Sequence, residues 1–204
     1  AALTNVFGVQ SEIASKVADS LGVVLGAGAE KQLAEKPTAN VAAYDSFLKG
    51  EQESAAMTAN DPAHLRKALG HYEAAVALDP AFALGWARVS SANALLYAQS
   101  IPNPDLAERA RGAAEKAIGL APLRWEGYHA LGNYHRLVNH DMGLAREQYA
   151  KGLRIAPTEV SLLGSSAAAE EGIGLWDSAL EHANQAVRFD PRSGKAESWK
   201  LDRD

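Results

Sequence analysis

The chain has 204 residues, of which 47% are hydrophobic and 22% are charged, and this composition supports a folded core rather than a disordered chain. Its net charge of −5 argues against general nucleic-acid binding, because such binding needs a basic face that neutralises phosphates. The sequence contains no cysteine, so disulfide frameworks and thiolate metal sites are excluded.

The first predicted element is a helix from Val6 to Leu25, with Thr4 as its N-cap. Apolar residues recur along it at three- and four-residue spacing and form one stripe: Val6, Val9, Ile13, Val17, Leu21 and Val24. We expect residues 1–39 to form an N-terminal helix and a connector, which cap the rest of the chain or link it to an upstream domain. Pairing of this helix with a second copy, giving a homodimer, is the alternative for its apolar stripe.

Four similar strings follow along the chain, and each ends in a proline. They are AVALDP, AIGLAP, GLRIAP and AVRFDP, and they end at Pro80, Pro122, Pro157 and Pro191. These prolines are separated by 42, 35 and 34 residues. Each string is the tail of an amphipathic helix closed by proline. A period near 34 residues with this ending predicts a helical repeat.

Each repeat is expected to hold two helices, A and B. In the first repeat, helix A is predicted over Val41 to Ala56, and helix B begins at Asp61-Pro62, with aspartate as N-cap and proline in the first turn. In the second repeat, a loop from Ser100 to Pro104 separates the helices. No strand-like alternation occurs, so the fold class is all-α. The residues expected to be buried are Tyr44, Phe47, Leu48, Leu65, Leu69, Tyr72, Ala75, Val76, Phe82, Trp86, Val89, Ala110, Ala114, Ala117, Ile118, Tyr128, Leu131, Gly132, Ala145, Tyr149, Gly152, Leu163, Ala167, Ala179, Ala183 and Ala186.

These positions resemble the tetratricopeptide repeat (TPR). Large residues stand six places after the earlier prolines, at Trp86, Tyr128 and Leu163. Small residues, which let helices A and B approach closely, stand twelve and five places before each closing proline. They are Ala68, Ala110, Ala145 and Ala179, and Ala75, Ala117, Gly152 and Ala186.

The resemblance implies a right-handed α-α superhelix of four helix pairs with an extra N-terminal helix. It places the repeats at residues 40–80, 81–122, 123–157 and 158–191, followed by a C-terminal capping segment at 192–204. The sequence departs from the pattern in places. Only the third repeat has a full Leu131-Gly132 pair, and the aromatic residue eight places before the closing proline occurs only as Tyr72 and Tyr149.

A finer resemblance concerns the strings VQSEIASKVADSL and AAYDSFLKG and the long loop of the second repeat. They are similar to the TPR region of bacterial multidomain proteins, in which an adenylate or guanylate cyclase, Ser/Thr kinase or winged-helix regulator module and a TolB-type domain lie upstream. This resemblance implies that any catalytic output lies before Ala1. We expect a cytoplasmic location, with the periplasm as the alternative if a membrane helix precedes the chain.

The sequence carries no pattern typical of an active site. Its six histidines do not show zinc-ligand spacing, and its glycines lack the context of a phosphate loop. Glu126, Glu170 and Glu171 are expected to be surface charges. Trp86 and Trp176 are expected in the packing between helices, and Trp125 is expected to pack at a helix start. We therefore predict no enzyme activity, no cofactor and no metal, and the chain shows neither a signal peptide nor a membrane span.

In the TPR pattern the A helices line a concave groove, and positions 2, 5, 9 and 12 of each helix face into it. The resemblance therefore implies partner contacts by Asp45, Lys49, Ser91, Glu126, His129, Asn133, Arg136 and Glu171. Only Asn133 and Lys49 fit the Lys/Asn/Arg clamp that some TPR proteins use for a C-terminal carboxylate, so no such clamp is predicted.

The groove hypothesis predicts an interaction scaffold that binds a protein or peptide partner, within a larger bacterial signalling protein. The alternative is a ligand-sensing regulatory domain that controls an upstream module. A groove that is only solvated, or that is filled by the chain's own first helix, also stays open.

Overall fold

The computed structural model describes Lys16 and residues 37–56, 62–99 and 103–191, and within these residues the secondary structure is entirely helical. The predicted all-α fold is confirmed. Apart from Lys16, the predicted helix from Val6 to Leu25 lies outside the described residues, and so do its homodimer contact and the predicted C-terminal capping segment at 192–204. The helices are α3 (Val41–Ala55), α4 (Pro62–Leu78), α5 (Ala83–Gln99), α6 (Pro104–Leu120), α7 (Trp125–Leu137), α8 (Met142–Ile155), α9 (Val160–Gly172) and α10 (Trp176–Phe189).

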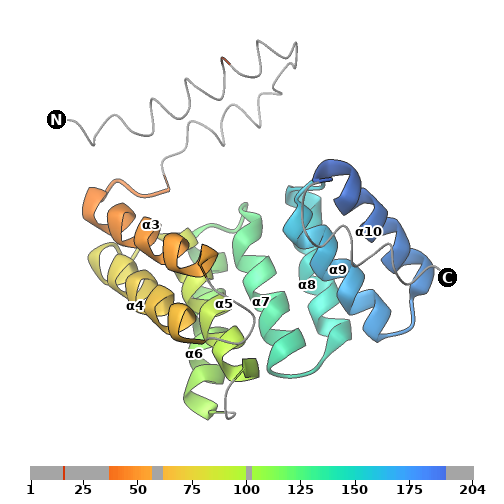
Figure 1. Ribbon diagram of the computed structural model, residues 1–204, viewed down its shortest axis with the longest axis horizontal. Helices are drawn as coiled ribbons and strands as arrows, with labels where there is room; N and C mark the ends of the chain where they lie inside the picture. Colours follow the sequence, from red (N-terminus) through yellow and green to blue (C-terminus); the bar gives the residue numbers. More distant parts are fainter. Residues whose placement is uncertain (1–15, 17–36, 57–61, 100–102, 192–204) are drawn as a thin grey trace.

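The helices pack in consecutive pairs, α3 with α4, α5 with α6, α7 with α8, and α9 with α10. Each pair joins the next, because α4 packs on α5, α6 on α7 and α8 on α9. The pairs follow one another in chain order, from α3 and α4 at one end to α9 and α10 at the other (Figure 1). None of the described helices has the length and apolar character needed to cross a bilayer.

Side-chain caps explain where three of the helices begin. The Asn40 side chain accepts hydrogen bonds from the amides of Ala42 and Ala43 before α3. Asp141 accepts one from Leu144 before α8. Asn103 caps α6, and Pro104 takes the first helical position, where its missing N–H costs nothing. The predicted loop to Pro104 is therefore one residue too long, since Pro104 belongs to α6.

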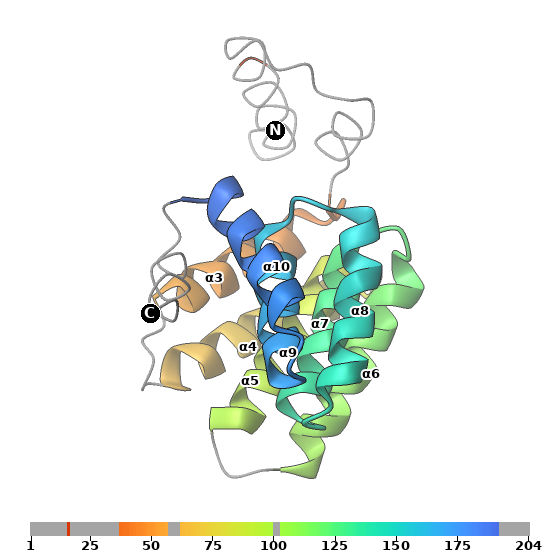
Figure 2. The same ribbon diagram turned by 90° about the vertical axis from the view of Figure 1, so that its right-hand side faces the viewer.

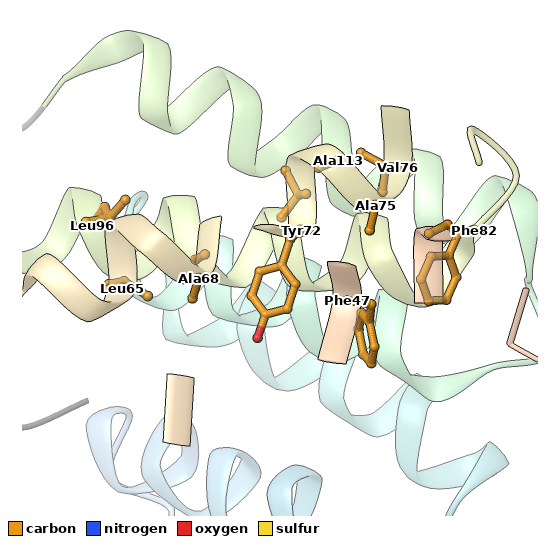
Figure 3. Close-up of a cluster of buried hydrophobic side chains, with 12 residues drawn as sticks. Phe47, Leu65, Ala68, Tyr72, Ala75, Val76, Phe82, Leu96 and Ala113 are labelled. Carbon is orange, nitrogen blue, oxygen red and sulfur yellow. The ribbon is translucent and has the colours of Figure 1, made fainter. Parts of the chain in front are cut away.

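The first and second repeats share one hydrophobic core, drawn in Figure 3, with three aromatic rings in it. The ring centroid of Phe47 lies 5.2 Å from that of Phe82 and 5.8 Å from that of Tyr72. The hydroxyl of Tyr72 points away from this cluster (Figure 3). Leu48, predicted to be buried, is 45% exposed, and Gly50 is buried in its place because the Tyr72 ring lies against it.

The predicted small positions at the helix contacts are confirmed. Alanine twelve places before each closing proline is buried in all four repeats, and so are the residues five places before. Gly152 shows why they are small, because a Cβ atom there would lie 2.8 Å from Cδ2 of Leu162 on the next helix. A side chain at this contact would overpack it.

Trp86 and Trp125 pack as predicted, and Trp176 does not. Trp86 is partly buried, and its ring nitrogen donates to the carbonyl of Pro80 at 3.0 Å. Trp125 packs partly buried against the cluster of Tyr149 and Leu162. Trp176 was expected in the packing but is 64% exposed, because it is the first residue of α10 and stands outside that helix's buried alanine face.

The segment before α3 is tied to the end of α4. The hydroxyl of Thr38 donates to the carboxylate of Asp79, and the side-chain amide of Asn40 donates to the carbonyl of Leu78 at 2.8 Å. The other carboxylate oxygen of Asp79 accepts from the amide of Ala81 at 3.0 Å. Residues 38 to 40 therefore meet the turn between α4 and α5 at a fixed place.

Candidate binding surface on the A helices

Three of the predicted contact residues lie in one hydrogen-bonded network that spans α7, α8 and α9. The hydroxyl of Tyr149 donates to Oδ1 of Asn133 at 2.8 Å, and Nε of Arg136 lies 3.4 Å from the same hydroxyl. Nε2 of His129 lies 3.0 Å from Oγ of Ser165, which joins α7 to α9. We call His129, Asn133, Arg136 and Ser165 the α7–α9 network. All four side chains are half-buried.

Gly132 makes this network possible. Tyr149 is fully buried, and its ring crosses α7 where Gly132 has no side chain. A Cβ atom at Gly132 would lie 2.3 Å from Cε1 of Tyr149, which is too close for two carbon atoms that are not bonded to each other. Burial raises the pKa of Tyr149 above its ordinary value. Its hydroxyl, which is protonated at neutral pH, donates to Asn133.

The first repeat repeats this arrangement with different chemistry. A Cβ atom at Gly50 would lie 2.5 Å from Cε1 of Tyr72, whose hydroxyl donates to Oε1 of Glu51 at 2.6 Å. Arg88 of α5 also holds Glu51, with Nε–Oε1 and Nη2–Oε2 distances of 2.8 and 3.2 Å. Glu51 thus occupies in α3 the place that Asn133 occupies in α7.

The electrostatics of Glu51 follow from these contacts. Burial acts to raise the pKa of its carboxyl group, but the hydrogen bond and positive charge of Arg88 outweigh burial and hold that pKa below its ordinary value. Burial and the bond to Glu51 both raise the pKa of Tyr72. The carboxylate, the guanidinium and the phenol form one satisfied group that joins the first repeat to the second.

Two of the predicted contact residues pair with each other instead of joining either network. Lys49 Nζ lies 2.7 Å from a carboxylate oxygen of Asp45, one helical turn away, and both side chains are more than half exposed. In the TPR pattern they are the nearest equivalents of the groove positions in the first repeat. The better signal was Gly50, which matches Gly132 and sets the register of α3.

The remaining predicted residues lie in different surroundings. Glu126 is buried, not a surface charge, because Nη2 of Arg124 binds its carboxylate at 2.6 Å. Ser91 is half-buried on α5, and Glu171 is exposed on α9 as expected. Glu170, also expected at the surface, is 2% exposed, because Arg146 and His182 bind its carboxylate.

The α7–α9 network suits polar recognition. Because Oδ1 of Asn133 accepts from Tyr149, its Nδ2 group is left to donate, and the guanidinium of Arg136 carries further donors. Within the described residues, no group of three or more histidine, aspartate and glutamate side chains is arranged to hold a metal ion.

Comparison with solved structures gives the fold. The chain resembles the crystal structure of MamA protein with a TM-score of 0.50 and 21% identity, over 96% of each chain. It resembles TTC0263, a thermophilic TPR protein of Thermus thermophilus, with a TM-score of 0.59 and 18% identity, over 78% of this chain and 97% of that one.

Comparison of sequences adds a short match. Small glutamine-rich tetratricopeptide repeat-containing protein 2 of Mycosarcoma maydis is 41% identical over 58 residues, which are 28% of this chain. The match spans only 16% of that relative's length. Profiles of known protein families give no match. The fold likeness and the pairwise packing agree with the proline register, and together they show that the chain has the helical-repeat fold of tetratricopeptide-repeat proteins.

Proposed function

We propose that the chain is a non-catalytic interaction scaffold that binds a segment of a partner protein on the A-helix surface of α7 and α9. The observation that carries this proposal is the bond from Tyr149 to Asn133, which fixes the amide with its NH2 group left to donate. The TPR fold supports it, because helical-repeat arrays typically present extended surfaces to partners.

The chemistry of the network favours an extended peptide. A peptide in extended conformation offers a main-chain carbonyl every second residue on one side, and an amide NH2 group can donate to such a carbonyl. Arg136 adds a positive charge one turn away from Asn133, so an acidic side chain on the peptide would gain a charge-assisted hydrogen bond. His129 and Ser165 extend the polar surface to the next repeat.

Peptides selected from a random display library against the chain would test this proposal. Dissociation constants of a selected peptide would be measured for the wild type, for Asn133→Ala and for Arg136→Ala, with Arg109→Ala on α6 as the matched control. We expect each network variant to weaken binding about tenfold or more, as removal of a central contact does. Equal affinity of all four proteins would contradict the assignment of the surface.

A second proposal concerns the context of the chain. We propose that it belongs to a larger regulatory protein, on the strength of the resemblance carried by residues 9–21 and 42–50. Reading the coding sequence before Ala1 tests this directly. A cyclase, kinase or winged-helix module there supports the proposal, and an unrelated module contradicts it.

A further inference from the structure

A pocket of about 340 Å³ lies among α8, α9 and α10, outside the α7–α9 network. Figure 2 shows the end of the array where these three helices gather. Ser166 and Glu170 of α9 line it together with His182 of α10, and Arg146, Ala150, Leu153 and Arg154 of α8 complete its wall. Ser165, the neighbour of Ser166, contacts His129 instead, so the two sites use different side chains.

The buried charge in this pocket is already balanced. The carboxylate of Glu170 is bound by Nε of Arg146 at 3.2 Å and by Nδ1 of His182 at 2.7 Å. Each of its oxygens therefore has a partner from another helix, as a buried carboxylate requires. Glu170 holds three helices together and is not the group that a ligand would need to satisfy.

The hydroxyl of Ser166 is different. Its residue is 2% exposed, and its Oγ atom has no hydrogen-bond partner in the described part of the protein. Buried polar groups in folded proteins are nearly always satisfied, and an unsatisfied one requires an explanation. Ser166 lines the pocket, so a rotation of its side chain that turns the buried hydroxyl toward the pocket would let a bound molecule supply the missing partner.

The charges around the pocket favour a ligand with a single negative charge. Arg146 and Arg154 provide two positive charges and Glu170 one negative charge, so one positive charge is left when His182 is neutral. A single carboxylate matches this charge better than a doubly charged phosphate. Ala150 and Leu153 add apolar wall on the same helix, and the volume is at the small end of ligand sites.

We propose that this pocket binds a small amphipathic monocarboxylate. Its carboxylate binds Arg154 and accepts the hydrogen bond of Ser166, and its apolar body lies against Ala150 and Leu153. The site is separate from the proposed partner surface, and its occupation adds a contact between the third and fourth repeats.

A second pocket in the array provides a matched control. It has a volume of about 500 Å³ and is lined by α4, α5 and α6, with Val76, Val89 and Ala113 among its apolar residues. Its cations are engaged, because Arg109 pairs with Glu73 at 3.2 Å and Nζ of Lys116 lies 3.8 Å above the ring of Trp86. Arg109→Gln thus removes the same charge as Arg154→Gln from a pocket without an unpartnered hydroxyl.

Titration with benzoate, followed by amide NMR shifts, tests the proposal, with benzamide as the uncharged probe of the same shape. We expect benzoate to shift resonances of α8 and α9 and to bind about tenfold more tightly than benzamide. Arg154→Gln should weaken benzoate binding about tenfold, and Ser166→Ala about fivefold. Arg109→Gln should leave the affinity unchanged.

Stability measurements separate a ligand role of Ser166 from a structural one. Because its hydroxyl has no partner among the residues that the structure describes, Ser166→Ala should weaken benzoate binding without lowering the melting temperature. The proposal is overturned if benzoate does not bind, if benzamide binds equally well, or if Arg154→Gln and Arg109→Gln have the same effect. It is also overturned if Ser166→Ala lowers the melting temperature and leaves the affinity unchanged.

Discussion

The first and third repeats share one packing arrangement, which we call the frame, but the polar residue in it differs between them. In each, a tyrosine of helix B crosses helix A at a glycine, Tyr72 at Gly50 and Tyr149 at Gly132, and its hydroxyl reaches the residue after that glycine. In the first repeat this residue is Glu51, whose carboxylate Arg88 of the next repeat binds with two hydrogen bonds. In the third repeat it is an asparagine.

The difference shows that the frame can either join two repeats or leave hydrogen-bond donors open to a partner. A carboxylate between a phenol and a guanidinium has its acceptors filled, so it holds two repeats together and offers little to a partner. An amide that accepts from the same phenol keeps its donor side open. The residue after the glycine therefore decides which role the frame takes.

The largest expected effect comes from removing either tyrosine. Tyr72→Ala and Tyr149→Ala should each lower the free energy of unfolding by about 3–5 kcal/mol, because each deletes a buried ring and leaves a cavity. Urea denaturation of both variants measures this. If the two frames are equivalent, the two losses should be similar. A loss below about 1 kcal/mol for either variant would show that its frame does not form.

Replacing either glycine with alanine should lower the free energy of unfolding by less than removing either tyrosine. Gly50→Ala and Gly132→Ala each place a Cβ atom against the tyrosine ring, and overpacking of this kind typically costs about 1–3 kcal/mol. In the double variants Gly50→Ala/Tyr72→Ala and Gly132→Ala/Tyr149→Ala the added methyl group has room, so the two losses should not add. Additive losses would contradict the close contact. Gly112→Ala, where nothing lies within 4 Å of the new atom, is the control.

Replacing the residue after the glycine, Glu51 or Asn133, should affect the salt dependence of stability differently in the two frames. Glu51→Gln keeps the shape of the side chain but removes its charge beside Arg88, so we expect a loss of about 1 kcal/mol, limited because both side chains are about one-third exposed. Asn133→Ala removes the acceptor of the Tyr149 hydroxyl, and Arg136 cannot replace it because a guanidinium only donates, so we expect a loss of about 1 kcal/mol there too. Thermal unfolding of both variants in low and high salt measures the difference. Only the Glu51 variant should lose salt sensitivity.

The smallest expected effect is a pH dependence carried by Glu51. Its pKa is lower in the folded protein than in the unfolded chain, so its contribution is fully present above the ordinary glutamate pKa of about 4.3. It is lost as the pH falls through the lowered value. The difference in unfolding free energy between the wild type and Glu51→Gln should therefore shrink between pH 6 and pH 3, by less than about 1 kcal/mol. A difference that grows in acid would contradict the assignment.

Much of the fold could be predicted from the sequence because its signals are local. Small residues stand at fixed distances before each closing proline, and they are buried where neighbouring helices touch. The burial of Glu126 and Glu170 was missed for a different reason. A glutamate is counted as exposed unless its partner is known, and the partners of Glu170 stand 24 residues before it and 12 after it.

The candidate surface could be predicted only in part. His129, Asn133 and Arg136 were predicted from the groove positions of the TPR pattern, and their spacing of three and four residues places them on one face of α7. Their role in binding a partner stays a prediction. Glu51 and Arg88 were missed, although Gly50 and Tyr72 carry the same signal as Gly132 and Tyr149. The pocket lined by Ser166 could not be foreseen, since it depends on the distances among three helices.

The hydrogen bonds that tie residues 38 to 40 to the end of α4 have a mechanical consequence. Tension on the chain before Pro37 acts on Thr38 and Asn40 before it reaches the first turn of α3. Their partners, Asp79 and Leu78, stand at the turn into the second repeat. Load is therefore shared by both helices of the first repeat from the start, and α3 is held at the point where it would otherwise begin to unravel.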